Sequence, residues 1–148
     1  MDFFTVGQNE PLPGQITPDQ LAKCNSESGH QKALFCWINI NKSLYPQLTL
    51  AFSIPNGGLR SKVTAARMVA EGVRKGVSDI FLPFPVLGYH GLFVEMKKPG
   101  TKGKREGKPK PEQEAFAELM TAQGYKVVFC WHWQEAAAEM VRYIGGYR

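Results

Sequence analysis

Three residues whose side chains could perform chemistry border two short apolar runs. Asp79 precedes the run 80–82, and Glu95 and Lys97 follow the run 91–94. Both runs are rich in β-forming residues and are bounded by Gly or Pro, which predicts two strands joined by a turn. Side chains alternate along a strand, so Glu95 and Lys97 project to the same face. If the strands pair with Asp79 near Glu95, two carboxylates and an ammonium group converge, and such carboxylates need a shared proton or a divalent cation.

The order of these residues resembles the PD-(D/E)XK nuclease superfamily, with Asp79, Glu95 and Lys97 as its D…E-x-K. An E-x-K triplet alone occurs by chance in many chains. Further segments in the same order are similar to the VRR-NUC (virus-type replication-repair nuclease) family, between residues 27 and 145. They are Pro55-Asn56-Gly57-Gly58-x-Arg60, Glu71-Gly72-Val73-x-x-Gly76-Val77-x-Asp79, Gly91-Leu92-Phe93-Val94-Glu95-Met96-Lys97, Gln113 and Gly124-Tyr125-x-Val127. Ser78 stands where the family usually has proline, which only shapes the start of the strand.

The resemblance implies a divalent metal site. Asp79 and Glu95 would supply carboxylate oxygens to the metal ion, and the backbone carbonyl of Met96 would supply a further ligand. Glu27 on the first helix would bind the ion directly or through water. Such oxygen ligands suit Mg²⁺, which binds one or two carboxylates and keeps several waters, and Mn²⁺ should substitute for it. The alternative for Glu27 is a solvated first-turn residue favoured by the helix dipole. His30 stands at a second position that is acidic in the family.

Lys97 and Gln113 complete the predicted catalytic set. We expect Lys97 to orient the attacking water or to stabilise charge on the phosphate, because the nearby carboxylates oppose the loss of its proton. The resemblance implies that Gln113 lies beside the active site, where it would hold the lysine or the phosphate. The alternative is an exposed residue early in a helix.

The elements that must position these residues follow an α/β pattern. The resemblance implies a mixed central β-sheet flanked by helices, with the restriction-endonuclease-like αβββαβ core. We expect an irregular N-terminal arm over residues 1–16 and a single nuclease domain over residues 17–148. Periodicity, caps and Gly or Pro stops predict helices beginning at 17 and 26, strands at 48–54, 80–82, 91–97 and 125–131, and helices at 61–75, 111–123 and 133–143. The run Asn56-Gly57-Gly58 is either a hairpin turn or, by the resemblance, a tight loop before a helix near the site.

The stretch from Lys98 to Lys110, called the basic segment below, is the most polar part of the chain. With almost no apolar atoms to bury, it is predicted to be a mobile loop. Because it directly follows Lys97, we expect its cations to contact DNA phosphates without reading base sequence, the alternative being a solvated linker. The predicted DNA-binding residues are Lys98, Lys102, Lys104, Arg105, Lys108 and Lys110, together with Arg60.

The composition agrees with a globular protein that binds a polyanion. A chain of 148 residues with net charge +5 is long enough for one domain with a core, and its charge favours an acidic partner. No apolar run approaches the roughly 20 residues of a membrane span, and the N-terminus lacks the basic region of a signal peptide, so a cytoplasmic location without a membrane partner is expected. The three cysteines have no C-x-x-C spacing and are predicted to be reduced, mostly buried thiols. The scattered histidines match no zinc motif, and no Walker loop is present.

Together these features predict a Mg²⁺-dependent DNA endonuclease. Stand-alone VRR-NUC domains are similar to Holliday-junction resolvases that act as homodimers, because two symmetric nicks need two active sites; such proteins are frequent in phages and bacteria. Exposed aromatic residues near both ends, Phe3, Phe4 and Tyr147, could form a dimer surface. The alternatives are a flap or nicking endonuclease, or a DNA-binding module with a catalytically silent site.

Overall fold

The computed structural model describes residues 6–55, 61–86 and 88–145. Its centre is a four-stranded sheet in the order β1-β2-β3-β4. Strands β1 (Phe52–Ser53), β2 (Ile80–Leu82) and β3 (Leu92–Met96) pair antiparallel, and β4 (Lys126–Cys130) runs parallel to β3. The helices are α1 (Pro18–Ala22), α2 (Glu27–Ile40), α3 (Lys62–Ala70), α4 (Pro111–Ala122) and α5 (Trp133–Gly145), with short 3-10 helices η2 (Pro46–Leu50) and η3 (Arg105–Gly107). The predicted mixed sheet with flanking helices is confirmed.

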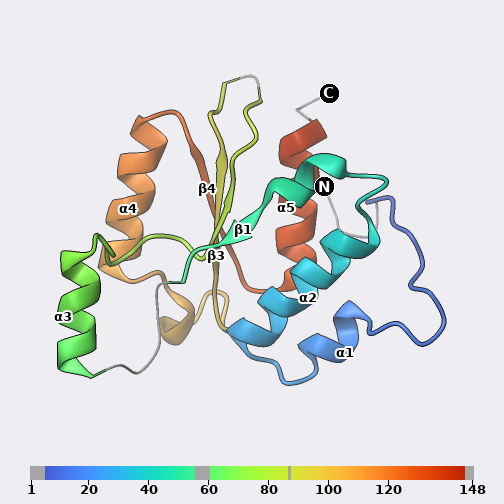
Figure 1. The fold of residues 1–148 in the computed structure, drawn as a ribbon, viewed down its shortest axis with the longest axis horizontal. Helices are drawn as coiled ribbons and strands as arrows, with labels where there is room; N and C mark the ends of the chain where they lie inside the picture. Colours follow the sequence, from blue (N-terminus) through green and yellow to red (C-terminus); the bar gives the residue numbers. More distant parts are fainter. Residues whose placement is uncertain (1–5, 56–60, 87, 146–148) are drawn as a thin grey trace.

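Helices cover both faces of this sheet, and the alternation along β3 matches the two layers. Helices α2 and α5 lie on one side of the sheet and α4 on the other (Figure 1). Leu92, Val94 and Met96 are buried in the core beneath α2 and α5. Phe93 points the other way, stacks on Phe81 and meets Phe116 of α4 edge to face. Glu95 and Lys97 lie two and four residues after Phe93, so they face the same α4 side of the sheet.

Side-chain caps set the starts of the first helices where the sequence predicts them. Thr17 accepts a hydrogen bond from the backbone of Gln20, whose side chain accepts one from Thr17 N–H, so the predicted capping box is present. Ser26 caps α2 through the backbone N–H of Gly29. These caps satisfy backbone donors that a helix start otherwise leaves without partners.

The predicted strand over 48–54 is wrong for most of its length. Residues 46–50 form η2, and only Phe52–Ser53 are paired in β1. Pro46 at the start of η2 has φ already fixed for a helical turn, and Thr49 Oγ1 donates to its carbonyl at 2.6 Å. This local hydrogen bonding competes with strand pairing and overrides the β-like composition.

Two other predicted elements differ in extent or character. Helix α3 ends at Ala70 instead of residue 75, because the chain turns at Gly72 with φ of 105°. The basic segment is not the loose loop that its polarity predicts. It contains η3, and Thr101 and Gly107 are buried within it. The Asn56-Gly57-Gly58 run and Arg60 lie outside the described residues.

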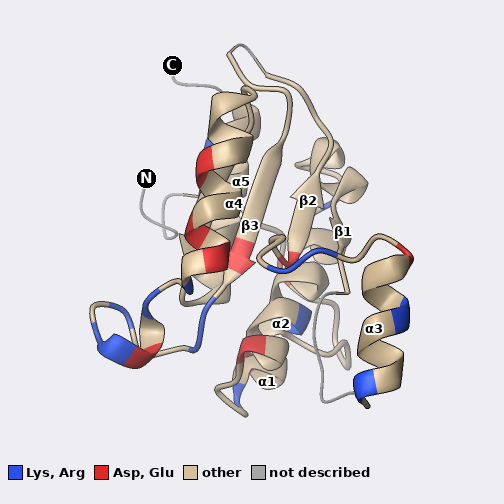
Figure 2. Cartoon of the chain, turned by 90° about the vertical axis from the view of Figure 1, so that its left-hand side faces the viewer, with Lys and Arg blue, Asp and Glu red and all other residues tan. Residues whose placement is uncertain are grey.

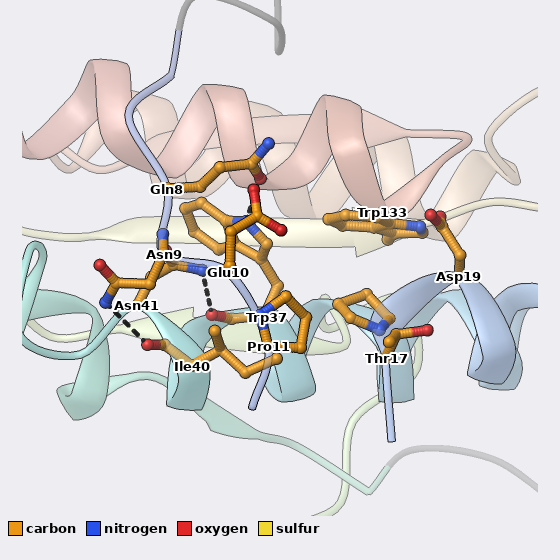
Figure 3. A pocket seen from close by; sticks show the side chains of 11 residues that line it. Gln8, Asn9, Glu10, Pro11, Thr17, Asp19, Trp37, Ile40, Asn41 and Trp133 are labelled. Atoms are coloured by element: carbon orange, nitrogen blue, oxygen red, sulfur yellow. Dashed lines mark hydrogen bonds between the residues drawn. The ribbon is translucent and has the colours of Figure 1, made fainter. Parts of the chain in front are cut away.

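Residues 6–16, the described part of the N-terminal arm, form no helix or strand. This part nevertheless packs on α2: Val6 is buried, and Asn9 N–H donates to Asn41 Oδ1 at 2.6 Å. Between arm and helices lies a cavity of about 300 Å³ whose walls include Trp37 and Trp133 (Figure 3). Within the described residues, no helix is both long enough and apolar enough to cross a membrane. The cysteines there are free, but Cys24 is exposed, contrary to the predicted burial, while Cys130 is buried.

Candidate active site

The pairing of β2 with β3 brings the predicted carboxylates together. Ile80 is paired with Val94, and the next antiparallel position joins Asp79 to Glu95. Asp79 Oδ2 accepts a hydrogen bond from the backbone N–H of Met96 at 2.8 Å, which fixes the aspartate against the end of β3. Glu95 is only 4% exposed. The predicted convergence of Asp79 and Glu95 at one sheet edge is therefore present.

Gln113 connects Glu95 to Lys97 through hydrogen bonds. Its Nε2 donates to Glu95 Oε1, and its Oε1 accepts from Lys97 Nζ at 3.0 Å. The same Oε1 accepts the backbone N–H of Lys110, which holds the glutamine in the first turn of α4. Lys97 is only 5% exposed, and its backbone N–H continues the β3–β4 ladder to Cys130 O at 2.8 Å. The alternative of an exposed, uninvolved Gln113 does not fit these contacts.

Close packing at Gly76 sets the position of the start of α4. Gly76 has φ of 83°, and a Cβ there would lie 2.1 Å from the backbone oxygen of Glu112. Only glycine allows this approach of the chain before β2 to the residue preceding Gln113. The Gly76 of the sequence motif thus determines the distance between the β2 side of the site and α4.

The electrostatics of the site favour protons or a cation on its carboxylates. The pKa of Glu95 is raised from 4.5 to about 8, mainly by burial and then by the negative charge of Asp79, against the lowering effect of Lys97. The pKa of Asp79 is also raised, mainly by burial, against the lowering effect of the Met96 N–H. A divalent cation would replace the proton and allow both groups to ionise.

Glu27 contributes to this field from the first residue of α2. Its charge raises the pKa of both Asp79 and Glu95, although Glu27 itself is exposed. In the part of the chain that the structure describes, no group of three His, Cys, Asp or Glu side chains has the arrangement of a metal site. A cation here would be held first by Asp79 and Glu95, which fits the preference of Mg²⁺ for few carboxylates and several waters.

His30 does not face the carboxylates as the family position would suggest. Its Nδ1 accepts the backbone N–H of Trp133 at 3.0 Å, and the ring is buried between α2 and α5. Burial and the neighbouring His132 lower the pKa of His30. A neutral imidazole in this place caps the start of α5 and has a structural role.

Positive charge flanks the site on both sides. Figure 2 shows acidic residues at the end of β3, with the basic segment on one side and α3 on the other. All cations of the basic segment are exposed, and those that form no ion pair in the described part of the chain are Lys98, Lys104, Arg105, Lys108 and Lys110. Lys102, also predicted to bind DNA, is instead paired with Glu135 of α5 at 2.6 Å. Sequence reasoning missed Glu135, because nothing in the spacing of the two residues marks them as partners.

The fold is shared with a solved structure described as a VRR_NUC domain protein. The two superpose with a TM-score of 0.65 at 22% sequence identity, covering 81% of this chain and 88% of that chain. No protein-family model and no curated protein matches the sequence. At this identity the likeness establishes the fold.

Proposed function

We propose that this protein is a divalent-metal-dependent DNA endonuclease of the PD-(D/E)XK type. The observation that carries the proposal is the pair of the half-buried Asp79 and the buried Glu95, with Lys97 linked to Glu95 through Gln113. Burying a carboxylate whose pKa is raised to about 8 is costly without a cation, and such costs are typical of functional sites. The shared fold with a VRR_NUC domain protein supports the same reaction class.

In this proposal the carboxylates hold the cation, and the remaining residues orient the reactants. Asp79, Glu95 and the Met96 carbonyl would hold Mg²⁺ or Mn²⁺, with Glu27 completing the site directly or through water. The bound ion would act as a Lewis acid and lower the pKa of water. Lys97 orients the attacking water and stabilises negative charge on the phosphate, and Gln113 fixes the Lys97 ammonium by accepting its hydrogen bond.

The exposed cations on both sides of the carboxylates would bind the DNA backbone. Lys104, Arg105 and Lys108 are exposed on one side, and Lys62 of α3 lies on the other. Contacts of this kind supply affinity that depends on salt and carry no base sequence. Arg60 stays a predicted contact, since it lies outside the described residues.

For the substrate we propose branched DNA, cut by a homodimer as in Holliday-junction resolution. This step rests on the resemblance to stand-alone VRR-NUC domains, and the residues named for a dimer surface, Phe3, Phe4 and Tyr147, lie outside the described part of the chain. A flap or nicking endonuclease would use the same site residues. The buried Glu95 and Lys97, which lie together with Asp79 at the ends of β2 and β3, speak against a silent DNA-binding module, because burying charged groups is costly without a functional use.

The test is cleavage of a labelled four-way junction beside matched linear duplex and flap DNA, with Mg²⁺, Mn²⁺ or EDTA. Wild type is compared with Asp79→Asn, which keeps the side-chain shape and removes the charge. Symmetric paired nicks in the junction that are lost with EDTA and with the variant support a dimeric resolvase. Cleavage confined to flap or duplex DNA would support the nuclease proposal and refute the four-way junction as substrate. Binding without metal-dependent cleavage of any substrate would refute the nuclease.

A further inference from the structure

The basic segment is folded against the end of the sheet instead of extending into solvent. Its first residues are fixed by a hydrogen bond from Thr101 Oγ1 to Lys98 O at 2.6 Å. The turn closes where Lys104 N–H donates to Thr101 O. Gly107 packs on the same carbonyl so closely that a Cβ would lie 2.0 Å from Thr101 O. These backbone contacts shape the turn within the polar chain, without an apolar core.

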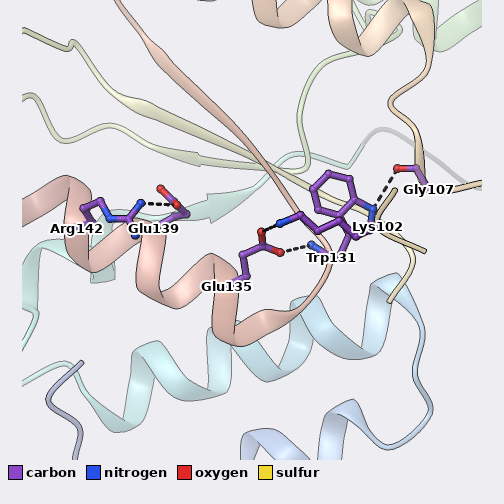
Figure 4. A network of polar contacts seen from close by, with 6 residues as sticks. All are labelled: Lys102, Gly107, Trp131, Glu135, Glu139 and Arg142. Atoms are coloured by element: carbon purple, nitrogen blue, oxygen red, sulfur yellow. Dashed lines mark hydrogen bonds and ion pairs between the residues drawn. The ribbon is translucent and has the colours of Figure 1, made fainter. Parts of the chain in front are cut away.

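The side chains of Trp131, which directly follows β4, and of Glu135 in α5 hold this turn at two points (Figure 4). Lys102 Nζ lies 2.6 Å from Glu135 Oε1 and 5.0 Å from the centre of the Trp131 ring. Glu135 Oε2 accepts the backbone N–H of Trp131 at 2.9 Å. Trp131 Nε1 in turn donates to Gly107 O at 3.1 Å. We call this set, Lys102, Gly107, Trp131 and Glu135, the clamp.

The clamp pairs one cation, Lys102, with an acidic side chain and leaves other cations of the basic segment available to bind a polyanion. Lys102 donates a hydrogen bond to Glu135, which raises the pKa of Lys102, and its side chain remains 62% exposed. Between the two points of attachment lie Lys104 and Arg105, and Lys108 follows directly; all three are exposed. In the described part of the chain none of these three forms an ion pair with an acidic side chain. The clamp therefore presents them at a fixed place beside the carboxylates.

We propose that Glu135 is a positioning residue that orients the basic segment toward the DNA backbone through Lys102 and Trp131. This inference rests on the proposed function of the site. The clamp converts a segment whose composition favours disorder into a preordered surface, so less conformational entropy is lost when phosphates bind. Glu135 contacts neither carboxylate of the active site, and its influence on the reaction passes only through the affinity for DNA.

The sign of the effect separates positioning from simple electrostatics. Glu135→Gln adds one positive charge to the protein and frees Lys102, so charge alone predicts equal or tighter binding of DNA. Loss of position predicts weaker binding in spite of the added charge. Glu139 provides the matched control: it lies one turn along α5 and pairs with Arg142 at 2.7 Å, and Glu139→Gln makes the same change in charge.

The experiment measures fluorescence anisotropy of labelled duplex and junction DNA in EDTA, over about 50 to 200 mM salt. In parallel, limited trypsin digestion tests whether the basic segment is protected. Glu135→Gln is expected to weaken binding by roughly threefold to tenfold and to expose the segment to trypsin. Lys102→Met should weaken binding similarly, and Lys102→Arg, which keeps the ion pair and the stacking, should restore it. Glu139→Gln should bind as well as wild type or better, with its basic segment protected.

The proposal is overturned if Glu135→Gln binds DNA as tightly as wild type, or if its basic segment resists trypsin as well as that of the control. The nuclease proposal fails separately, when wild type binds DNA but shows no metal-dependent cleavage; the comparison of dissociation constants then still decides the role of Glu135. Where cleavage is measurable, Glu135→Gln should raise KM with little change in kcat. A large fall in kcat would instead place Glu135 in the chemistry and refute a role in positioning alone.

Discussion

Replacing Glu95 by glutamine should stabilise the metal-free protein at alkaline pH. Glu95 lies buried beside Asp79, and its pKa is raised from 4.5 to about 8 in the folded chain. A carboxyl group whose pKa is higher in the folded state binds its proton more tightly there than in the unfolded state. Its contribution to stability is therefore complete below pH 4.5 and is lost as the pH rises through about 8.

The size of the effect follows from the same values. Between the two pKa values the free energy of unfolding falls by about 1.4 kcal/mol for each pH unit. Over the interval from 4.5 to about 8 the loss is on the order of 3 to 5 kcal/mol once the site relaxes around the ionised group. Glutamine removes the ionisation and keeps an oxygen that accepts the hydrogen bond of Gln113 Nε2. The variant should match wild type near pH 5 and exceed its stability above pH 8.

The assay is urea denaturation in EDTA from about pH 5 to 9 for wild type and Glu95→Gln. A divalent cation should stabilise wild type at alkaline pH by replacing the lost proton, and it should affect the variant much less. Glu118→Gln, at an exposed carboxylate of α4, serves as the control for a general loss of acidic charge. The reasoning is refuted if the difference between wild type and Glu95→Gln is the same at every pH.

Other variants separate the remaining roles. Lys97→Ala should bind DNA within about threefold of wild type but lower single-turnover cleavage by a factor of about 100 or more, and near-normal turnover would remove its catalytic role. Lys104→Ala should reduce the salt dependence of DNA binding by about 0.9 in log–log slope, whereas an unchanged slope would mean no phosphate contact. Gly76→Ala should lower the free energy of unfolding by more than about 2 kcal/mol, because its Cβ would collide with Glu112 O. Gly14→Ala is the control in thermal melts, since Gly14 also has positive φ but open space around it, and equal losses would contradict the packing argument.

Local composition predicts the parts of this fold that depend on residues close in sequence. The apolar runs at 80–82 and 91–94 predict two paired strands, and the structure shows β2 and β3 pairing antiparallel there. The register of this pairing alone brings Asp79 to Glu95. Thr17 and Gln20 form the predicted capping box. In these places propensity, turn residues and burial all favour the same structure.

The failures occur where contacts distant in sequence or local hydrogen bonds decide. The strand expected at 48–54 yields to a 3-10 turn that begins at Pro46. The basic segment is ordered by Trp131 and Glu135, which follow it by more than twenty residues and carry no motif. The position of Gln113 came from the resemblance, and its contacts with Glu95 and Lys97 required the structure. Polarity predicts disorder only when no such partners exist.

The burial of every residue of β3 has a consequence for how the candidate site is lost on heating. Along β3, core side chains alternate with side chains on the face of the candidate active site. Strands β2 and β4 pair with β3 on its two sides. Its amide hydrogens can exchange with solvent only when the sheet opens, so their protection should report global unfolding, unlike that of the basic segment. Heat inactivation of the site and cooperative melting should therefore coincide. Any cation or nucleotide that binds at the carboxylates of Asp79 and Glu95 should slow amide hydrogen exchange throughout β3.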